Sequence, residues 1–235
     1  MLLDAIDTMK KIETEMKKKI VILILIGLSS ASYAQLGISA GAQLLYGFGS
    51  NQLFKGLNLG VEIPRTEQSS ILVRAYATLR NTYKDSTYAE AIDPLTSPVM
   101  MRVDMRNGIS TFGLEGGMRR YFLGSNFDYG FSLYGGSMFS FSLYHMTSKV
   151  LSPIDESLYA LPNRSQGSVF MLNFGLNGGM KKQFTFGTLF MDLSLSYAIV
   201  ATGSAKFTGI SQGKLSMLNF GCVVGYRKDL FFNVN

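Results

Sequence analysis

Hydrophobic and polar residues alternate along most of the chain from about residue 36 onward. In one stretch, Leu57, Leu59, Val61 and Ile63 share one face, and the residues between them are polar or glycine. Because side chains of a β-strand point alternately to opposite faces, this period of two predicts strands rather than helices. Eight segments show the pattern, covering approximately residues 36–48, 54–64, 71–80, 111–119, 127–142, 170–181, 188–202 and 218–227.

The polar faces distinguish a membrane barrel from a soluble β-sandwich, since both have one apolar face on each strand. These faces consist mostly of Gly, Ser and Asn, whereas a water-facing sheet is normally rich in Lys, Glu and Thr. Small side chains suit the interior of an eight-stranded barrel, which is just wide enough to be filled by side chains. We therefore predict an all-β fold, an eight-stranded antiparallel transmembrane β-barrel (an up-and-down meander) with its apolar faces outward.

Isolated charges on the polar faces would be buried inside this barrel, where charged groups need partners. A packed interior of salt bridges is favoured over an open pore, because eight strands leave no room for an aqueous channel. The predicted barrel-interior charges are Glu62, Arg74, Arg80, Glu115, Arg119, Asp128, Lys181, Asp192 and Arg227.

The connections between the predicted strands alternate in length. Short connections fall near residues 64–69, 123–126 and 183–185, and long ones near residues 85–107, 148–166 and 203–214. Short turns on one side and long loops on the other are typical of outer-membrane barrels. The link near residues 49–52 departs from the pattern, because it is short but belongs to the long-loop side.

Aromatic residues gather at the short-turn end, beside basic residues such as Arg120 and Lys182. Aromatic rings collect at the membrane–water boundary, so this cluster indicates the periplasmic edge of a membrane belt. The predicted periplasmic aromatic girdle consists of Tyr121, Phe122, Phe127, Phe184, Phe186, Phe231 and Phe232.

Composition supports the membrane interpretation. Only 16% of the residues are charged, below the roughly 25% of an average soluble domain. Past the N-terminal segment no apolar run reaches the roughly 18 residues of a membrane helix, so strands would have to make the span. The net charge of +6 does not call for nucleic acid, and one Cys (Cys222) and one His (His145) argue against a zinc site. We expect no cofactor and no metal.

The first residues of the chain have the order of an export signal. Residues 17–19 are lysines, residues 20–28 form an apolar run, and residues 29–34 are mostly small. This order is that of a cleaved secretory signal peptide. We expect residues 1–34 to be an N-terminal extension plus the signal peptide, and residues 35–235 to be the barrel. The true start stays open between Met1, Met9 and Met16.

Glycine-rich segments such as 112–117 (FGLEGG), and a last segment with Gly225-Tyr226-Arg227 followed by aromatic residues 231–232, carry a family resemblance. With the signal peptide and the eight alternating segments, they make the chain resemble the small outer-membrane β-barrel proteins of the OmpA/OmpX-like superfamily. The Tyr-rich loops also resemble the PorT-like barrels of Bacteroidetes. The resemblance implies a Gram-negative outer membrane, contact with its lipid, and recognition of the last strand by the barrel-assembly machinery. The chain departs from the pattern because Asn233-Val234-Asn235 follow the aromatic residues.

The expected function is non-enzymatic, either structural or a binding role of loops 84–107 and 148–166, since loops on a rigid scaffold commonly carry recognition. The partner would be an extracellular ligand or another outer-membrane protein. Two alternatives stay open: an accessory subunit of an outer-membrane secretion or assembly machine, and a lipid-modifying enzyme. The enzyme would use His145 near the long-loop rim, with Thr147 on the same face and Ser148 next to it.

Overall fold

The computed structural model describes residues 36–125, 130–160, 167–203 and 215–230. The predicted signal peptide in residues 1–34 lies outside these ranges and stays a prediction. None of the described residues forms a helix long and apolar enough to cross a membrane. The described strands are β1 (Leu36–Gly47), β2 (Gln52–Thr66), β3 (Ser69–Thr78), β4 (Asn81–Ala91), β5 (Met100–Leu123), β6 (Phe131–Val150), β7 (Tyr159–Ala160), β8 (Gly167–Phe184), β9 (Gly187–Gly203) and β10 (Leu218–Leu230).

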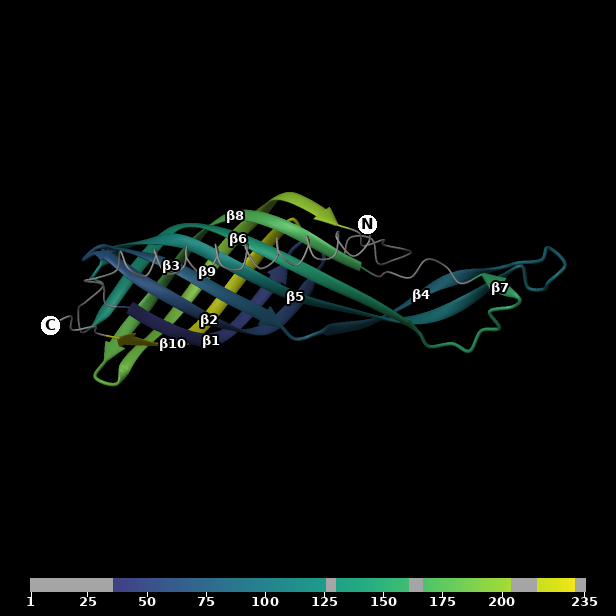
Figure 1. The fold of residues 1–235 in the computed structure, drawn as a ribbon, viewed down its shortest axis with the longest axis horizontal. Coiled ribbons are helices and arrows are strands. Elements are labelled where there is room, and N and C mark those ends of the chain that lie inside the picture. The colour runs from purple at the N-terminus through teal and green to yellow at the C-terminus, as the bar shows by residue number, and fades with distance from the viewer. Residues whose placement is uncertain (1–35, 126–129, 161–166, 204–214, 231–235) are drawn as a thin grey trace, which may run out of the picture. The chain divides into compact units, whose positions relative to one another are not determined.

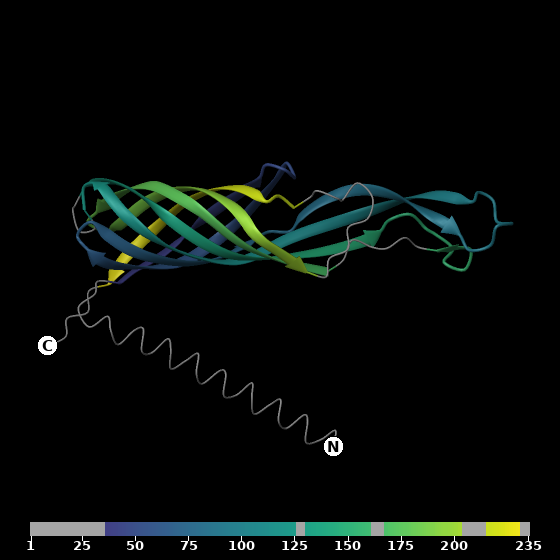
Figure 2. The same ribbon diagram turned by 90° about the horizontal axis from the view of Figure 1, so that it is seen from above.

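Eight of these strands close into a ring. The ring order is β1, β2, β3, β5, β6, β8, β9 and β10, and β10 pairs back with β1. Every pairing in the ring is antiparallel. Figures 1 and 2 show these strands tilted around a common axis. The predicted eight-stranded antiparallel barrel is confirmed.

The alternation of residue types gives the barrel wall two different faces. In the β1–β10 ladder, Gln43 lies opposite Val223 and both are buried, whereas their neighbours Leu44 and Cys222 point outward. Leu57 on β2 is 71% exposed on the outer wall. Many other large apolar side chains are exposed on this wall. Because such a surface is unfavourable in water, the outer wall faces lipid.

Strands β4 and β7 lie outside the ring. β4 pairs with the first part of β5, from Asn81 opposite Ile109 to Glu90 opposite Met100, and β7 adds two residue pairs to the far end of β4. β6 continues beside β5 as far as Val150. These strands prolong the wall beyond one rim of the barrel, towards the right in Figure 1. We call residues 81–107 and 148–160 the strand extension.

The strand extension corrects the prediction of a loop over residues 84–107. Both sides of that segment are strands, and only residues 92–99 connect them. Within the predicted loop 148–166, β6 runs on to residue 150 and residues 159–160 form β7, while residues 161–166 lie outside the described ranges. Two of the predicted short links are confirmed, because residues 67–68 and 185–186 form short turns at the opposite rim. Residue 126 of the predicted short link 123–126 and residues 204–214 of the predicted long link 203–214 lie outside the described ranges.

Candidate functional site

Glu62 on β2 is the centre of a charged cluster inside the barrel. Its Oε2 accepts hydrogen bonds from Arg119 at 2.7 Å and from Arg227 at 2.8 Å. Its Oε1 accepts from Ser70 at 2.5 Å and from Tyr121 at 2.8 Å. These donors come from β3, β5 and β10, so one carboxylate connects strands across the interior. A buried carboxylate with this many donors has its hydrogen-bonding capacity well satisfied.

Asp192 on β9 is a second centre of the same cluster. Its Oδ2 accepts from Arg119 Nη2 at 2.5 Å and from Arg74 Nη1 at 2.8 Å, and its Oδ1 accepts from the Tyr134 hydroxyl at 2.5 Å. Arg74 also pairs with Glu115, its neighbour across the β3–β5 ladder. Arg119 therefore bridges the two centres, because its guanidinium group reaches both carboxylates.

The cluster is balanced in charge. Asp229 meets Nε of Arg227 at 3.0 Å, and Nζ of Lys181 lies 4.6 Å from the centroid of the Tyr121 ring. The members are four basic residues, Arg74, Arg119, Lys181 and Arg227, and four acidic residues, Glu62, Glu115, Asp192 and Asp229. Removing one member of such a buried network leaves a charge uncompensated, so the cluster favours a single arrangement of the strands around it.

The interior near the strand extension is apolar instead. The rings of Phe54 and Tyr144 meet edge to face, with centroids 6.1 Å apart. Tyr83 of the strand extension packs against this group from above. The apolar layer consists of Leu45, Phe54, Ile109, Tyr144, Met146, Val169, Met171 and Ala198. It lies on the side of the interior from which the strand extension rises.

A small polar cavity lies between the charged cluster and the apolar layer. The hydroxyls of Tyr76 and Ser142 are 2.7 Å apart, and Asn173 Nδ2 donates to Ser140 Oγ and Ser142 Oγ at 3.1 Å each. The space open to the centre of a water molecule is about 10 Å³, which is room for about one water. Side chains thus pack across the barrel interior at this level, and the space left among them is small.

Seven of the nine predicted interior charges lie in the charged cluster. Arg80 corrects the prediction: it is exposed, because β3 ends at Thr78 and the wall passes there into the strand extension, where Arg80 packs beside Gly108. Asp128 lies outside the described residues. Asp229 belongs to the cluster but was missed, although it follows Arg227 by two residues and so shares its inward face.

The aromatic girdle needs a similar correction. Tyr121 is buried and donates to Glu62, because its position on β5 has the same inward direction as Arg119. Of the other predicted members, Phe122 and Phe186 are exposed on the outer wall and Phe184 is half-buried, while Phe127, Phe231 and Phe232 lie outside the described residues. Tyr226, which was not among the predicted members, continues a stack formed by the rings of Phe184 and Phe186.

β5 exchanges its polar and apolar faces where it leaves the barrel. Within the barrel, Leu114 is exposed on the outer wall and Glu115 is buried in the interior. Within the strand extension, Val103 and Met105 occupy the inward positions and are buried with Ala89 and Tyr159 in a small apolar core. The outward positions there carry Arg102, Asp104 and Arg106. A charged outer face over an apolar core is the arrangement of a sheet in water.

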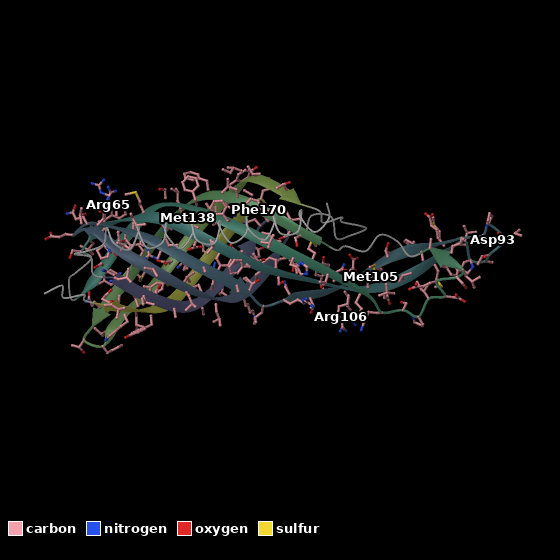
Figure 3. All side chains as sticks on the ribbon, viewed as in Figure 1. Arg65, Asp93, Met105, Arg106, Met138 and Phe170 are labelled. Atoms are coloured by element: carbon pink, nitrogen blue, oxygen red, sulfur yellow. The ribbon has the colours of Figure 1, made fainter. Side chains whose placement is uncertain are left out.

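The far end of the strand extension exposes apolar side chains. Ala91 N donates to Val99 O and Thr96 N to Asp93 O, each at 2.9 Å, so the connecting segment has a defined conformation. Asp93 marks this end in Figure 3. We call the exposed group Tyr88, Ile92, Leu95, Val99 and Met100 the apolar tip; Leu95 is 90% exposed. Clustered exposed apolar side chains on an element in water are typical of contact surfaces.

Residues 155–158 form a tight turn before β7. The backbone N–H and the hydroxyl of Ser157 donate to Asp155 Oδ1 at 2.9 and 2.5 Å. These hydrogen bonds lower the pKa of the Asp155 carboxyl below its ordinary value, because they favour its charged form. The turn thus holds the chain that leads into β7 against the far end of β4.

His145 lies exposed on the outer wall of β6, near the rim of the strand extension. Its Nδ1 is 3.2 Å from Oγ of Ser168 on β8. Ser168 and Ser110 on β5 are its direct neighbours on the two adjacent strands. Ser148, one of the predicted hydroxyl partners, donates instead to Asn107 Oδ1 at 2.6 Å. Among the described residues no group of three or more His, Cys, Asp or Glu is placed to hold a metal ion.

Some solved structures are similar to this chain at low sequence identity. No family model matches the chain, and no curated protein matches it in sequence. Similar solved structures include Ail, the attachment invasion locus protein of Yersinia pestis (10% identity, 83% of this chain and 97% of that chain, TM-score 0.41). Others are neisserial surface protein A (10%, 84% and 97%, 0.45) and a major outer membrane protein from Thermus thermophilus (13%, 83% and 99%, 0.44). The barrel described above rests on its own strand pairing.

Proposed function

We propose that this protein is an anchored binding protein of a Gram-negative outer membrane. The closed barrel holds the strand extension in water beyond the membrane, and the apolar tip contacts a macromolecular partner. The exchange of faces along β5 carries the proposal. A strand that is apolar outward in the barrel and charged outward beyond it passes from lipid into water.

The filled interior supports an anchoring role rather than a transport role. The interior contains the charged cluster, the apolar layer and, between them, the polar side chains around the small cavity. The carboxylates of Glu62 and Asp192 accept from arginines of the cluster and from neighbouring hydroxyl groups, so these groups serve to hold the barrel together. A non-enzymatic scaffold is the simplest use of such a structure.

The surface chemistry of the strand extension fits a protein partner with an apolar contact surface. The apolar tip would form the centre of the interface. Beside it, a groove of about 440 Å³ is lined by polar and charged side chains that include Lys84, Arg102 and Asp104. An apolar centre with a polar rim is the usual composition of a protein–protein interface.

Photo-crosslinking in living cells tests this proposal. A crosslinking amino acid at Leu95 should give a discrete product, which should weaken when Ile92 and Val99 are changed to serine. The matched control is the crosslinker at Lys55. This residue is exposed on the barrel strand β2, at the rim from which the strand extension rises. No discrete product at Leu95, or the same product from Lys55, would overturn the proposal.

The identity of a crosslinked partner would also test the accessory-subunit alternative. A partner that is itself part of an outer-membrane secretion or assembly machine would make this chain an accessory subunit bound through its apolar tip. A partner from outside the cell would leave that alternative without support.

A second candidate function is hydrolysis of lipid esters at the outer wall, favoured by the 3.2 Å contact between His145 and Ser168. Ser168 Oγ would attack an ester carbonyl carbon while His145 Nδ1 takes its proton. The ester C–O bond would break, the leaving alcohol would take the proton back from the imidazolium, and the acyl group would stay on Ser168. Water activated by the same imidazole would release the fatty acid and restore the serine.

A fluorophosphonate probe tests this second candidate, because it labels only serines that are activated as nucleophiles. The probe should label the folded protein, and both Ser168→Ala and His145→Ala should abolish the label. Ser110→Ala is the matched control, since Ser110 also lies directly beside His145. Labelling that survives Ser168→Ala, or no labelling at all, would reject the candidate.

A further inference from the structure

Three aromatic rings form a continuous platform on the outer wall at the short-turn end. Phe184 ends β8, Phe186 lies in the β8–β9 turn and Tyr226 lies on β10. The rings of Phe184 and Phe186 stack with centroids 5.2 Å apart, and those of Phe186 and Tyr226 with centroids 6.4 Å apart. We call these three residues the aromatic platform.

The aromatic platform is held by backbone contacts in the turn. The Tyr226 hydroxyl donates to the carbonyl oxygen of Phe186. Gly187 follows with φ of +150°, and a Cβ at this position would collide with the Tyr226 ring. Glycine is therefore needed for the turn to close over Tyr226. This geometry is specified by the chain and is more than a scatter of interfacial aromatic residues.

Two ammonium groups border the aromatic platform. Nζ of Lys182 on β8 lies 5.4 Å from the centroid of the Phe184 ring, and Nζ of Lys228 on β10 donates to Phe186 O at 3.2 Å. Both lysines are exposed on the outer wall. Asp229, the residue after Lys228, pairs instead with Arg227 of the charged cluster.

The wall next to the aromatic platform is apolar. Leu189 on β9 lies directly between Lys182 and Tyr226 in the strand register, and it is exposed to the lipid side. Farther from the turn, Met180 and Val224 lie on either side of Met191 in the register, and both are exposed in the same way. Cations at the end of an apolar strip match the two parts of a phospholipid, the phosphate and the acyl chains.

We propose that the aromatic platform with Lys182 and Lys228 binds one anionic phospholipid of the membrane leaflet on the short-turn side. Its phosphodiester accepts from the two ammonium groups, its glycerol region covers the ring edges, and its acyl chains follow Met180, Leu189 and Val224. The site selects lipids with net negative charge, because one phosphate in a zwitterionic lipid already has its own cation.

Native mass spectrometry of the full chain in detergent tests this site with phosphatidylglycerol and phosphatidylcholine as probes. The protein should retain one phosphatidylglycerol in preference to phosphatidylcholine. The double variant Lys182→Gln/Lys228→Gln should lose this preference. Each lysine should contribute about fivefold to the affinity for phosphatidylglycerol, which corresponds to about 1 kcal/mol. The double variant Lys182→Arg/Lys228→Arg should keep the preference for phosphatidylglycerol, because both positive charges remain.

The matched control is Arg65→Gln/Arg120→Gln. Both arginines are exposed cations at the same end, but on β2 and β5, which are not ring neighbours of β8 or β10. Figure 3 shows Arg65 projecting from that end. This variant should bind like the unchanged protein. A migration shift on unheated SDS gels would show that each variant is folded.

Three results would overturn the proposal. Equal retention of the two lipids would mean that binding does not depend on the net charge of the lipid. An equal loss of the preference in the Arg65→Gln/Arg120→Gln variant would mean that the exposed cations at this end attract anionic lipid together, without a site at the aromatic platform. Competition by free glycerol phosphate, as strong as competition by phosphatidylglycerol, would mean that the site takes a soluble phosphate and not a lipid.

Discussion

β5 in the barrel and β5 in the strand extension are parts of one continuous strand of 24 residues, yet their side chains are arranged oppositely. In the barrel, apolar Leu114 faces outward and charged Glu115 and Arg119 are buried. In the strand extension, apolar Val103 is buried and charged Arg102 faces outward. The backbone pairing is antiparallel in both parts.

The surroundings of the strand explain this difference. In water, burial of apolar surface drives the small core of Ala89, Val103, Met105 and Tyr159. In lipid, no such drive favours moving apolar side chains inward, so polar groups withdraw from the hydrocarbon and satisfy one another inside. The position of the exchange, between about residues 106 and 112, marks the edge of the membrane belt on β5.

Glu62→Gln should have the largest effect among the tests of this comparison. It leaves Arg119 and Arg227 without their shared carboxylate, and breaking a buried pair costs about 3–5 kcal/mol. In the strand extension, Asp104→Asn removes an exposed partner of Arg102, for which a change below about 1 kcal/mol is expected. Urea titration of folding in lipid vesicles measures both. Equal losses would contradict the idea that the buried charges stabilise only the barrel.

An exchange of residue types on the outer face of β5 should have the next largest effect. Leu114→Arg places a charge in lipid and should cost about 2–4 kcal/mol. Arg102→Leu changes an outward residue in water and should cost about 0.5 kcal/mol or less. The same titration in vesicles compares the two variants. A large loss for Arg102→Leu together with a small one for Leu114→Arg would place the lipid belt at the wrong end of β5.

Removal of residues 81–107, the first segment of the strand extension, should change the stability of the barrel still less. Replacing residues 81–107 with a short Gly-Asn turn keeps the β3–β5 ladder, which runs from Ser69 opposite Arg120 to Ala77 opposite Phe112. The barrel should fold with a stability within about 1 kcal/mol of the full chain, because loop closure entropy changes slowly with length. The migration shift on SDS gels reports the closed barrel. Loss of that shift would mean that the strand extension is required to close it.

Acidification should loosen the turn at Asp155 with the smallest effect. The pKa of this carboxyl is lowered in the folded chain by hydrogen bonds from Ser157. Its contribution is therefore complete above the ordinary value of 3.8 and is lost as the pH falls through the lower, folded pKa. The amide protection factors of residues 155–160 should fall only below about pH 4. Ser157→Ala should weaken this pH dependence, because it removes the hydroxyl donor and keeps the backbone N–H. Protection that is independent of pH in the unchanged chain would contradict the assignment.

The residues of the barrel wall show how far the period of two leads. Leu57 and Leu59 point to lipid and Glu62 and Arg74 to the interior because neighbouring positions on a strand must face opposite sides. The same rule, applied one step farther, places Tyr121 and Asp229 inside. Tyr121 was assigned to the girdle because its residue type was given more weight than its position, and Asp229 was left out because the predicted last strand ended at Arg227. Arg80 was misplaced because the end of β3 at Thr78 is not marked by the alternation itself.

The strand extension was missed for a different physical reason. Met101, Val103 and Met105 alternate with charged residues just as strands do, but their phase is opposite to that of the barrel. If every outward side chain is assumed to face lipid, such a segment is predicted to be a polar loop. Its strand signal is visible only when the outward side is taken to be water.

The sequence by itself determined the number of barrel strands, their antiparallel succession and the side of the wall on which most residues lie. These follow from local periodicity, which each strand carries independently of the others. Only the tertiary structure decided which partners the buried charges take, that Leu45 joins an apolar layer, and that Ser168 meets His145. Such contacts depend on the register between strands far apart in the chain, and register is a property of the closed ring as a whole.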